Sequence, residues 1–298
     1  MKRKVAIQGI PGCNHYIAAN RFFSKDEIET IDCSTFKQLA ISVVKDPGVL
    51  AVMAIENTIA GSILQNYQIV RENNLVVVGE YKLRISHSLV ALNGVDIHSI
   101  KEINSHPMAL MQCGDFLDTL PNVKLVEKED TAGSAKWIKE NKLTAHAAIC
   151  PAGAAKIFGM NVLANGIETN KRNFTRFLVL ANKTVAKEVF AEINKDTNEC
   201  VKGECKSENY INKSSLVFTL PHTSGSLSKV LSVLSFYDMN LSMIQSLPII
   251  GKEWEYQFYI NLLFTDYNRY KQAIDAIRPL TKEFGILGEY AAGINDIE

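Results

Sequence analysis

The chain has 298 residues, of which 47% are hydrophobic and 21% are charged, so it can bury the cores of about two domains. Its 32 Lys and Arg residues balance 32 Asp and Glu residues. This balance argues against a dedicated nucleic-acid-binding protein, because no overall positive charge faces a phosphate backbone.

No apolar run approaches the roughly 18 residues of a membrane span. Pro11-Gly12 interrupts the basic-then-apolar start, which indicates a first β-strand rather than a signal peptide. Of six cysteines, only Cys200 and Cys205 lie close together, and a single C-x4-C pair is a weak metal signal. We therefore expect no metal, no membrane partner, and reduced thiols in a cytoplasmic protein.

The first 180 residues alternate short β-branched runs with helical patterns. The predicted strands are residues 5–8, 49–55, 75–78, 87–91, 102–104 and 147–149. The predicted helices are residues 16–23, 35–45, 107–117, 131–140 and 151–157. This alternation predicts an α/β fold with a mostly parallel sheet, whose ligands bind in loops at the carboxyl ends of the strands.

The composition changes between residues 183 and 213, where six Lys alternate with six acidic residues and Asn and Gly collect. This stretch indicates a charged linker, with a solvated helix possible over residues 185–193. It divides the chain into domains at residues 1–182 and 214–298.

A compact pattern follows the linker. Strands are predicted at residues 214–220, 241–247, 256–264 and 286–291, and helices at residues 224–239 and 267–284. The order βαββαβ is that of a ferredoxin-like α+β module. The sheet edge and open face of so small a module are expected to pair with a partner copy.

Two loops follow predicted strands in the N-terminal half. Gly9-Ile10-Pro11-Gly12 can bring its backbone close to an anion or form a plain strand-to-helix turn, and its spacing is not that of a dinucleotide-binding loop. Glu56-Asn57-Thr58 follows a buried strand, where its polar groups can cap a helix, face a ligand, or do both.

Two further segments carry polar chemistry. Ser105 can cap a helix that has Pro107 in its first turn, and His106 is placed to reach a cleft. Arg176 lies between two Phe residues and beside Thr175, which suits a carboxylate site but also an ordinary strand with a surface Arg.

Together these segments resemble prephenate dehydratases. The resemblance is carried by Glu56-Asn57-Thr58 with Gly61, Ser105-His106-Pro107 with Gln112-Cys113, Asp130-Thr131-Ala132, and Asn173-Phe174-Thr175-Arg176-Phe177. They stand in that family's order, and the last is its most specific signature. Residues 214–298 resemble the ACT regulatory domain that usually follows the catalytic part, so the resemblance covers nearly the whole chain.

The resemblance implies a cofactor-free carbon–oxygen lyase of phenylalanine biosynthesis that converts prephenate to phenylpyruvate. It also implies a catalytic domain of two lobes around a cleft, similar to periplasmic binding proteins. L-Phenylalanine is expected to inhibit through the ACT domain of a homodimer or homotetramer. No N-terminal chorismate mutase domain is expected, because the first strand starts by Val5.

Site residues are carried over by position. Arg176 is expected to grip a substrate carboxylate and Thr175 to hydrogen-bond the leaving hydroxyl, with Asn57 and Thr58 completing the catalytic set. Further substrate contacts are expected from Glu56, Ser105, His106, Gln112, Phe177, Gly12 and Cys13. The expected L-phenylalanine site comprises Gly225, Ser226, Leu227, Asn240, Leu241 and Ser242.

The chain departs from the family in two places. Cys13 replaces a hydroxyl residue of the first loop, and Gln245 and Leu247 replace Glu and Arg of the regulatory motif. Phenylalanine control is therefore expected to be weaker, retuned or built differently. Two other functions stay open: the same chemistry on arogenate, and a non-catalytic sensor of an aromatic amino acid.

Overall fold

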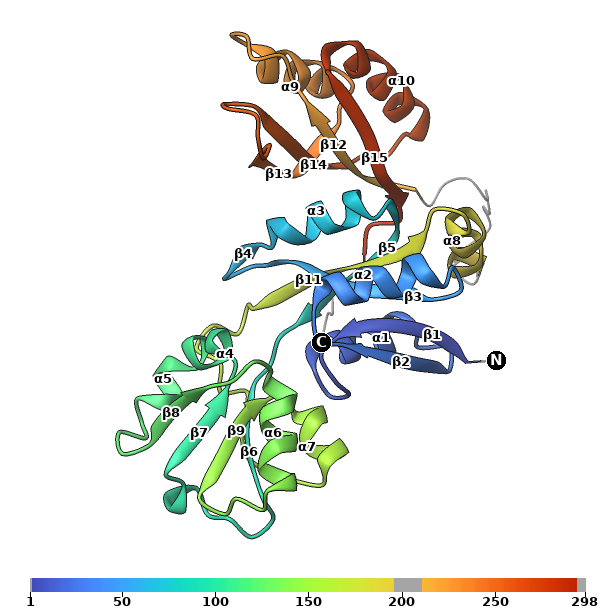
Figure 1. The fold of residues 1–298 in the computed structure, drawn as a ribbon. Helices are drawn as coiled ribbons and strands as arrows, with labels where there is room; N and C mark the ends of the chain where they lie inside the picture. Colours follow the sequence, from blue (N-terminus) through green and yellow to red (C-terminus); the bar gives the residue numbers. More distant parts are fainter. Residues whose placement is uncertain (1, 196–210, 294–298) are drawn as a thin grey trace.

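A computed structural model describes residues 2–195 and 211–293. Figure 1 shows three bodies in a row, with the C-terminal module (residues 211–293) at the top. Lobe I (residues 2–87 and 166–195) lies in the middle, and lobe II (residues 88–165) lies at the bottom. None of the described helices is both long and apolar enough to span a bilayer.

Lobe I is built on a sheet in the order β2-β1-β3-β11-β5, with β4 paired to β3. Its strands are β1 (Arg3–Gln8), β2 (Ile28–Cys33), β3 (Leu50–Asn57), β4 (Gly61–Ser62), β5 (Leu75–Arg84) and β11 (Phe174–Asn182). Its helices are α1 (Asn14–Phe22), α2 (Phe36–Lys45), α3 (Leu64–Glu72) and α8 (Ala186–Lys195).

The predicted mostly parallel sheet is wrong. β1 runs parallel to β2 and β3, but β11 is antiparallel to both β3 and β5. The physical reason is that the chain leaves lobe I after β5 and returns as β11, so the returning strand enters from the lobe II end.

Lobe II has a second mixed sheet in the order β10-β6-β9-β7-β8. Its strands are β6 (Ser88–Ala91), β7 (Glu102–Ser105), β8 (Lys124–Glu127), β9 (His146–Cys150) and β10 (Asn161–Asn165). Its helices are η1 (Ile97–Ser99), α4 (Pro107–Gln112), α5 (Gly114–Leu117), α6 (Thr131–Glu140) and α7 (Ala152–Phe158). The two segments that join the lobes, residues 85–87 and 166–173, lie side by side because Ser88 pairs with Asn165.

The C-terminal module has the βαββαβ order, and its sheet runs β13-β14-β12-β15. Its elements are β12 (Lys213–Thr219), α9 (Ser226–Phe236), β13 (Asn240–Pro248), β14 (Tyr256–Leu263), α10 (Tyr267–Ile277), η3 (Arg278–Leu280) and β15 (Glu283–Tyr290). The predicted helix over residues 267–284 is too long. Pro279 lies in the η3 turn that follows α10, and the chain is already extended at Glu283.

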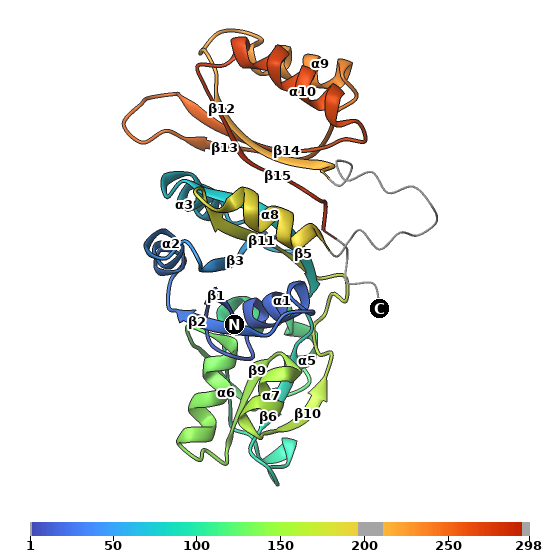
Figure 2. The same cartoon turned by 90° about the vertical axis from the view of Figure 1, so that its right-hand side faces the viewer.

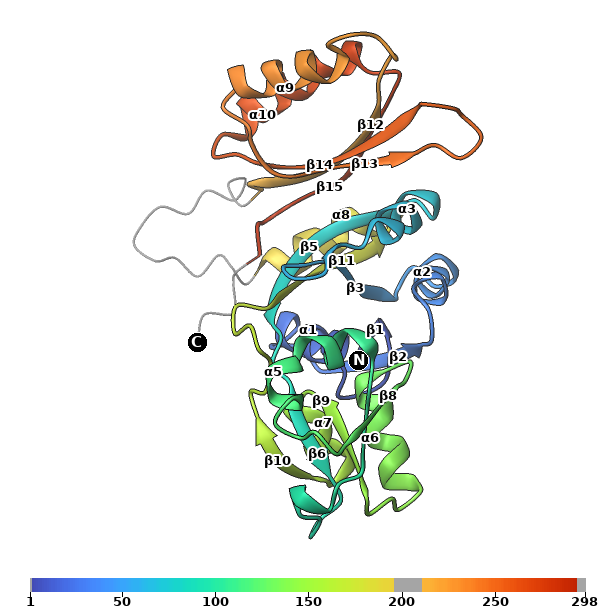
Figure 3. The same cartoon turned by 90° about the vertical axis from the view of Figure 1, so that its left-hand side faces the viewer.

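The module's sheet is buried on both faces along β12. Leu216 and Phe218 of β12 belong to the core beneath α9 and α10, whereas Val217 belongs to a core shared with lobe I. Figures 2 and 3 show α9 and α10 above the module's sheet and lobe I below it. Lobe I thus covers the open face that was expected to pair with a partner copy, and β15 approaches β5 closely where Gly288 meets Val77.

The predicted linker contains a packed helix. α8 places Val189, Phe190 and Ile193 against the core of lobe I, so one face of the helix is not solvated. The rest of that stretch, residues 196–210, lies outside the described residues and includes Cys200 and Cys205. Among residues 2–195 and 211–293, no three His, Cys, Asp or Glu side chains are grouped to hold a metal ion.

Candidate active site

Polar side chains meet where β3 ends and β11 begins, beside the two segments that join the lobes. Asn57 Nδ2 lies 2.7 Å from Asn173 Oδ1 and 2.9 Å from Thr175 Oγ1. Asn57 Oδ1 accepts hydrogen bonds from the backbone N–H groups of Ile59 and Ala60 at 2.9 and 2.8 Å. The Asn57 amide is therefore held in one orientation, with its donor end toward Thr175.

The same cluster reaches lobe II through Gln112. Asn173 Nδ2 donates to Gln112 Oε1 at 2.9 Å, and His87 Nε2 lies 3.0 Å from that oxygen. Since an amide oxygen only accepts, the arrangement assigns the imidazole proton to Nε2. Burial lowers the pKa of His87, although Gln112 and Glu168 act in the opposite direction, so the ring is neutral at pH 7.

A buried carboxylate lies beside this histidine. Glu168 is 1% exposed, and its Oε2 accepts the backbone N–H of His87 at 2.9 Å. Its Oε1 lies 3.6 Å from Arg84 Nη2 and 3.9 Å from Lys171 Nζ. Neither His87 nor Glu168 was predicted as a site residue, because His87 opens an apolar run and Glu168 belongs to no recognised motif.

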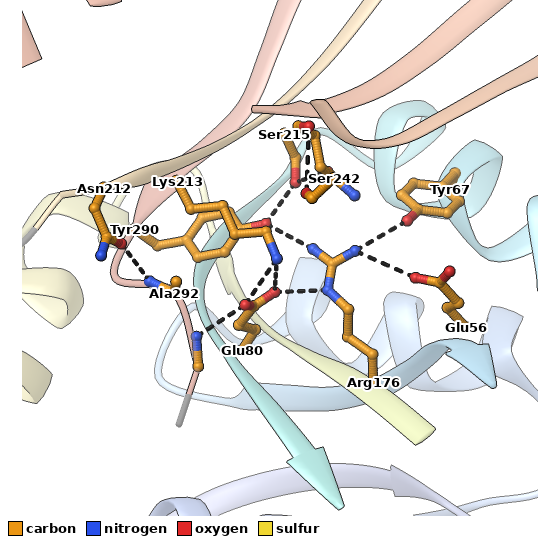
Figure 4. A network of polar contacts seen from close by, with 12 residues as sticks. Glu56, Tyr67, Glu80, Arg176, Asn212, Lys213, Ser215, Ser242, Tyr290 and Ala292 are labelled. Atoms are coloured by element: carbon orange, nitrogen blue, oxygen red, sulfur yellow. Dashed lines mark hydrogen bonds and ion pairs between the residues drawn. The ribbon is translucent and has the colours of Figure 1, made fainter. Parts of the chain in front are cut away.

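Arg176 faces away from this cluster. Successive residues of a strand point to opposite faces, and Thr175 and Arg176 are neighbours in β11. Arg176 is 7% exposed; its Nε donates to Glu80 Oε2 at 2.6 Å and its Nη2 to the Tyr290 hydroxyl at 2.9 Å (Figure 4). The structure therefore contradicts the predicted placement of Arg176 beside Thr175 in one carboxylate-binding site.

Glu56 also lies on the Arg176 side of the ladder. Its Oε2 is 3.8 Å from Arg176 Nη1, and the carboxylate is 37% exposed. Together with Thr58, Lys82 and Phe174, these two residues line a cavity of about 290 Å³. Polar side chains at the end of β3 and the start of β11 thus lie on both faces of the lobe I sheet.

Three other predicted residues serve the local fold. Thr58 Oγ1 accepts the Phe174 N–H at 2.9 Å, which fixes the loop before β11. Ser105 is fully buried and its hydroxyl donates to the Ile149 carbonyl at 2.6 Å, so it is neither a helix cap nor a cleft residue. His106 caps α4 instead, since its Nδ1 accepts the Met108 N–H at 3.2 Å.

Phe177 is not a wall of the cleft. It is 1% exposed and its ring meets the His15 ring edge-on, with centroids 5.0 Å apart. The His15 Nε2 accepts the Ala54 N–H at 3.2 Å, and burial lowers its pKa to about 3. Phe177 therefore belongs to the core beneath β11, because residues 175, 177 and 179 share the face that packs on α1.

The first loop is a contact between the lobes. Gly12 has a φ of 95°, and a Cβ at this position would lie 2.8 Å from the Ala154 Cα on α7. Cys13 is buried, and its sulfur accepts the Tyr16 N–H and donates to the Gln8 carbonyl, both at 3.5 Å. Burial raises the Cys13 pKa to about 12, so the thiol that caps α1 stays protonated at neutral pH.

The predicted L-phenylalanine residues fall into two groups. Gly225, Ser226 and Leu227 lie at the start of α9, and Ser226 and Leu227 line a cavity of about 330 Å³. Asn240, Leu241 and Ser242 open β13, beyond the other end of that helix. A helix of 11 residues is about 16 Å long, so the two groups do not form one small-molecule site within a chain.

The fold and the polar cluster define the class of the protein: a two-lobed α/β domain with polar groups at its hinge, joined to a ferredoxin-like module. A family model described as prephenate dehydratase matches residues 5–185. The chain belongs to the prephenate dehydratase family.

Curated relatives agree with this assignment. A bifunctional chorismate mutase/prephenate dehydratase of Buchnera aphidicola subsp. Acyrthosiphon pisum is 31% identical over 285 residues, which cover 95% of this chain and 69% of the relative. Arogenate dehydratase 2 of Petunia hybrida is 36% identical over 246 residues, which cover 83% of this chain and 57% of that protein. The chain thus spans between about half and two thirds of these relatives.

Two solved structures share the whole fold. Prephenate dehydratase of Arthrobacter aurescens in complex with L-Phe has a TM-score of 0.80 at 25% identity, covering 97% of this chain and 90% of that one. GqqA, described as a quorum quenching acylase, has a TM-score of 0.82 at 25% identity, covering 98% of both chains.

Proposed function

We propose that this chain converts prephenate to phenylpyruvate. The C–C bond to the ring carboxylate breaks, CO2 leaves, and the released electron pair enters the ring as the ring hydroxyl departs. A proton supplied to that hydroxyl makes the second product water. The electrons balance within the substrate, so the reaction needs no external oxidant or reductant.

The observation that carries the proposal is the orientation of the Thr175 hydroxyl. Its oxygen faces Asn57 Nδ2 at 2.9 Å, which leaves the hydroxyl proton to be donated elsewhere. A hydroxyl that accepts one hydrogen bond becomes a better donor in the next. We assign this proton to the leaving oxygen, where hydrogen bonding to developing charge lowers the barrier.

The role of the remaining cluster is to keep that geometry fixed. Asn173 links Asn57 to Gln112, and His87 orients Gln112 from the segment that joins the lobes. These hydrogen bonds connect Gln112 of lobe II to Thr175 of lobe I, so a movement of lobe II would change the surroundings of the Thr175 hydroxyl. A neutral His87 suits this role because it holds Gln112 without adding a positive charge to the cluster.

We also propose that residues 214–298 are an ACT domain that binds L-phenylalanine and acts in a cytoplasmic homo-oligomer. Gly225 and Asn240 lie at opposite ends of the module. A site that uses both groups needs two chains side by side, which favours a dimer or a tetramer. The L-Phe complex of the Arthrobacter aurescens enzyme supports the choice of ligand.

Arogenate is the second candidate substrate, because several similar plant proteins are named arogenate dehydratases. Arogenate carries an ammonium where prephenate carries a keto group. Glu56, whose carboxylate is 37% exposed at the end of β3, lies on the Arg176 side of the ladder, so it does not favour arogenate at a site built around Thr175.

The test is to incubate the purified chain with prephenate and with arogenate, each with and without L-phenylalanine. Phenylpyruvate is followed by its ultraviolet absorbance and phenylalanine by chromatography. We expect turnover of prephenate, loss of turnover in Thr175→Ala, and partial inhibition by L-phenylalanine. No turnover of either substrate would refute the enzyme and favour the non-catalytic sensor.

A further inference from the structure

We propose that Arg176 is a positioning residue through which the C-terminal module sets the position of Thr175. The group responsible is a buried network of Glu80, Arg176, Lys213 and Tyr290, which we call the Glu80 network. The inference rests on the proposed dehydratase function and adds a coupling route that the sequence motifs do not indicate.

The centre of the network is the carboxylate of Glu80 on β5, whose side chain has no exposed surface. It accepts the Arg176 Nε of β11 at 2.6 Å and the Lys213 Nζ of β12 at 2.8 and 2.9 Å. It also accepts the backbone N–H of Gly293, after β15, at 2.8 Å. One carboxylate of lobe I therefore binds both the first strand of the module, through Lys213, and the residues that follow its last strand, through Gly293 (Figure 4).

A second set of contacts carries the network into the module's sheet. Arg176 Nη2 donates to the Tyr290 hydroxyl at 2.9 Å, and that hydroxyl lies 2.6 Å from Ser215 Oγ. Ser215 Oγ is in turn 2.6 Å from Asn261 Oδ1 on the central strand β14. The guanidinium is thus held between a lobe I carboxylate and a hydroxyl that belongs to the module.

Every member of the network is almost fully enclosed. Glu80 and Lys213 are each 3% exposed, Arg176 is 7% exposed, and Tyr290 is 0% exposed. A buried charge that loses its partner is costly, since no water replaces the lost hydrogen bond. A shift of the module moves Tyr290 and Lys213, so Arg176 and Glu80 either move with them or each lose a buried hydrogen bond.

Arg176 can pass this displacement to Thr175 because the two residues share a peptide bond on a central strand. The β3–β11 ladder changes register between Arg176 and Phe177, so the pairing is irregular beside Thr175. A register shift of this kind disrupts the ladder locally, so β11 is held less regularly to β3 at this point than elsewhere along the pair. Displacing the Thr175 hydroxyl by a fraction of an ångström changes its fit to the reacting atoms.

The chain offers a matched test in two buried tyrosines of the module. Tyr290 and Tyr270 are both 0% exposed. The Tyr290 hydroxyl accepts from Arg176, whereas the Tyr270 hydroxyl donates to Ser214 Oγ at 2.8 Å and stays inside the module. Tyr290→Phe and Tyr270→Phe each remove one buried hydroxyl, but only the first removes the direct hydrogen bond between Arg176 and the module.

We expect Tyr290→Phe to lower kcat for prephenate roughly tenfold while KM stays within about twofold. Tyr270→Phe should stay within about twofold in both constants, with a similar change in melting temperature. Amide hydrogen exchange of the peptide over residues 174–182 should rise in Tyr290→Phe only. Where Tyr290→Phe folds poorly, Ser215→Ala replaces it, and Ser214→Ala is its control.

Equal kcat values and equal exchange in the two tyrosine variants would overturn the coupling. A wild-type chain without turnover would instead refute the proposed function, and with it a positioning role in that reaction. Hydrogen exchange separates the two failures, because it reports the link between Tyr290 and β11 whether or not prephenate is the substrate.

Discussion

The Thr175 hydroxyl can be tested with little disturbance of the fold by Thr175→Val, which keeps the shape of the side chain. Thr175 is 9% exposed and forms the first pair of the β3–β11 ladder, opposite Asn57. The substitution removes one acceptor of Asn57 Nδ2. That amide keeps the Asn173 Oδ1 at 2.7 Å and the Phe174 carbonyl at 3.2 Å, so no buried donor is left unpaired.

The expected loss of stability is therefore that of one ordinary hydrogen bond, about 1 kcal/mol. For a domain of this size that corresponds to a fall in melting temperature of roughly 2–4 °C. The expected loss of activity is much larger. Removing one donor to a developing negative oxygen costs about 10²–10³ in kcat, and KM for prephenate should change little because the hydroxyl acts mainly in the transition state.

The assay measures kcat and KM from initial rates of phenylpyruvate formation, with melting temperatures from the same preparations. Thr219→Val is the control, since Thr219 is a buried strand threonine of the module whose hydroxyl accepts the Glu283 N–H at 3.1 Å. A kcat within threefold of wild type in Thr175→Val would refute the role given to this hydroxyl. An equal loss in Thr219→Val would show that the assay reports stability.

Two further predictions concern packing and charge. Burial and the nearby Arg176 lower the pKa of Lys213 from 10.5 to about 8. Between these two pH values the unfolded chain therefore binds more protons than the folded chain. The free energy of unfolding then rises with pH, by up to about 1.4 kcal/mol per pH unit. Urea unfolding from pH 7 to 10 should show this rise in wild type but not in Lys213→Met, and a flat difference would contradict the burial of the ammonium. Gly12→Ala should destabilise the chain by more than about 1 kcal/mol, because its Cβ would meet Ala154 at a φ of 95°. Gly94→Ala is its control, since Gly94 has a φ of 82° with open space around it. Equal losses of unfolding free energy in the two variants would show that the loss comes from backbone strain alone and not from the contact between the lobes.

Strong local patterns predicted most of the framework. The helix over residues 131–140 has the bounds of α6. The predicted strands 5–8 and 102–104 lie within β1 and β7, and the predicted strand 49–55 begins one residue before β3. Weakly apolar elements were missed, among them β8 and β10, because two or more residues of each are exposed and leave no clear period. These strands form only because the neighbouring strand supplies the hydrogen-bonded edge.

Glu80 shows why part of the site could not be predicted. The predicted strand ended at Val78, since a glycine and a carboxylate normally end an apolar run. β5 instead continues to Arg84 because the Glu80 charge is neutralised by Arg176 and Lys213, which lie 96 and 133 residues further along the chain. The alternation of side chains along β11 places Thr175 and Arg176 on opposite faces of the sheet. Which of these two faces packs against the C-terminal module depends on partners as distant in the sequence as these.

The two chain crossings between the lobes also bear on the order of folding during synthesis. β11 lies between β3 and β5 in space but is the last strand of lobe I to be made. About 100 residues separate the end of β5 from the end of β11, which takes the ribosome roughly 5–20 s. Lobe II, whose ends pair at Ser88 and Asn165, is complete within that time. Lobe I must wait with the edges of β3 and β5 unpaired, and those edges are where a stalled or truncated nascent chain would aggregate.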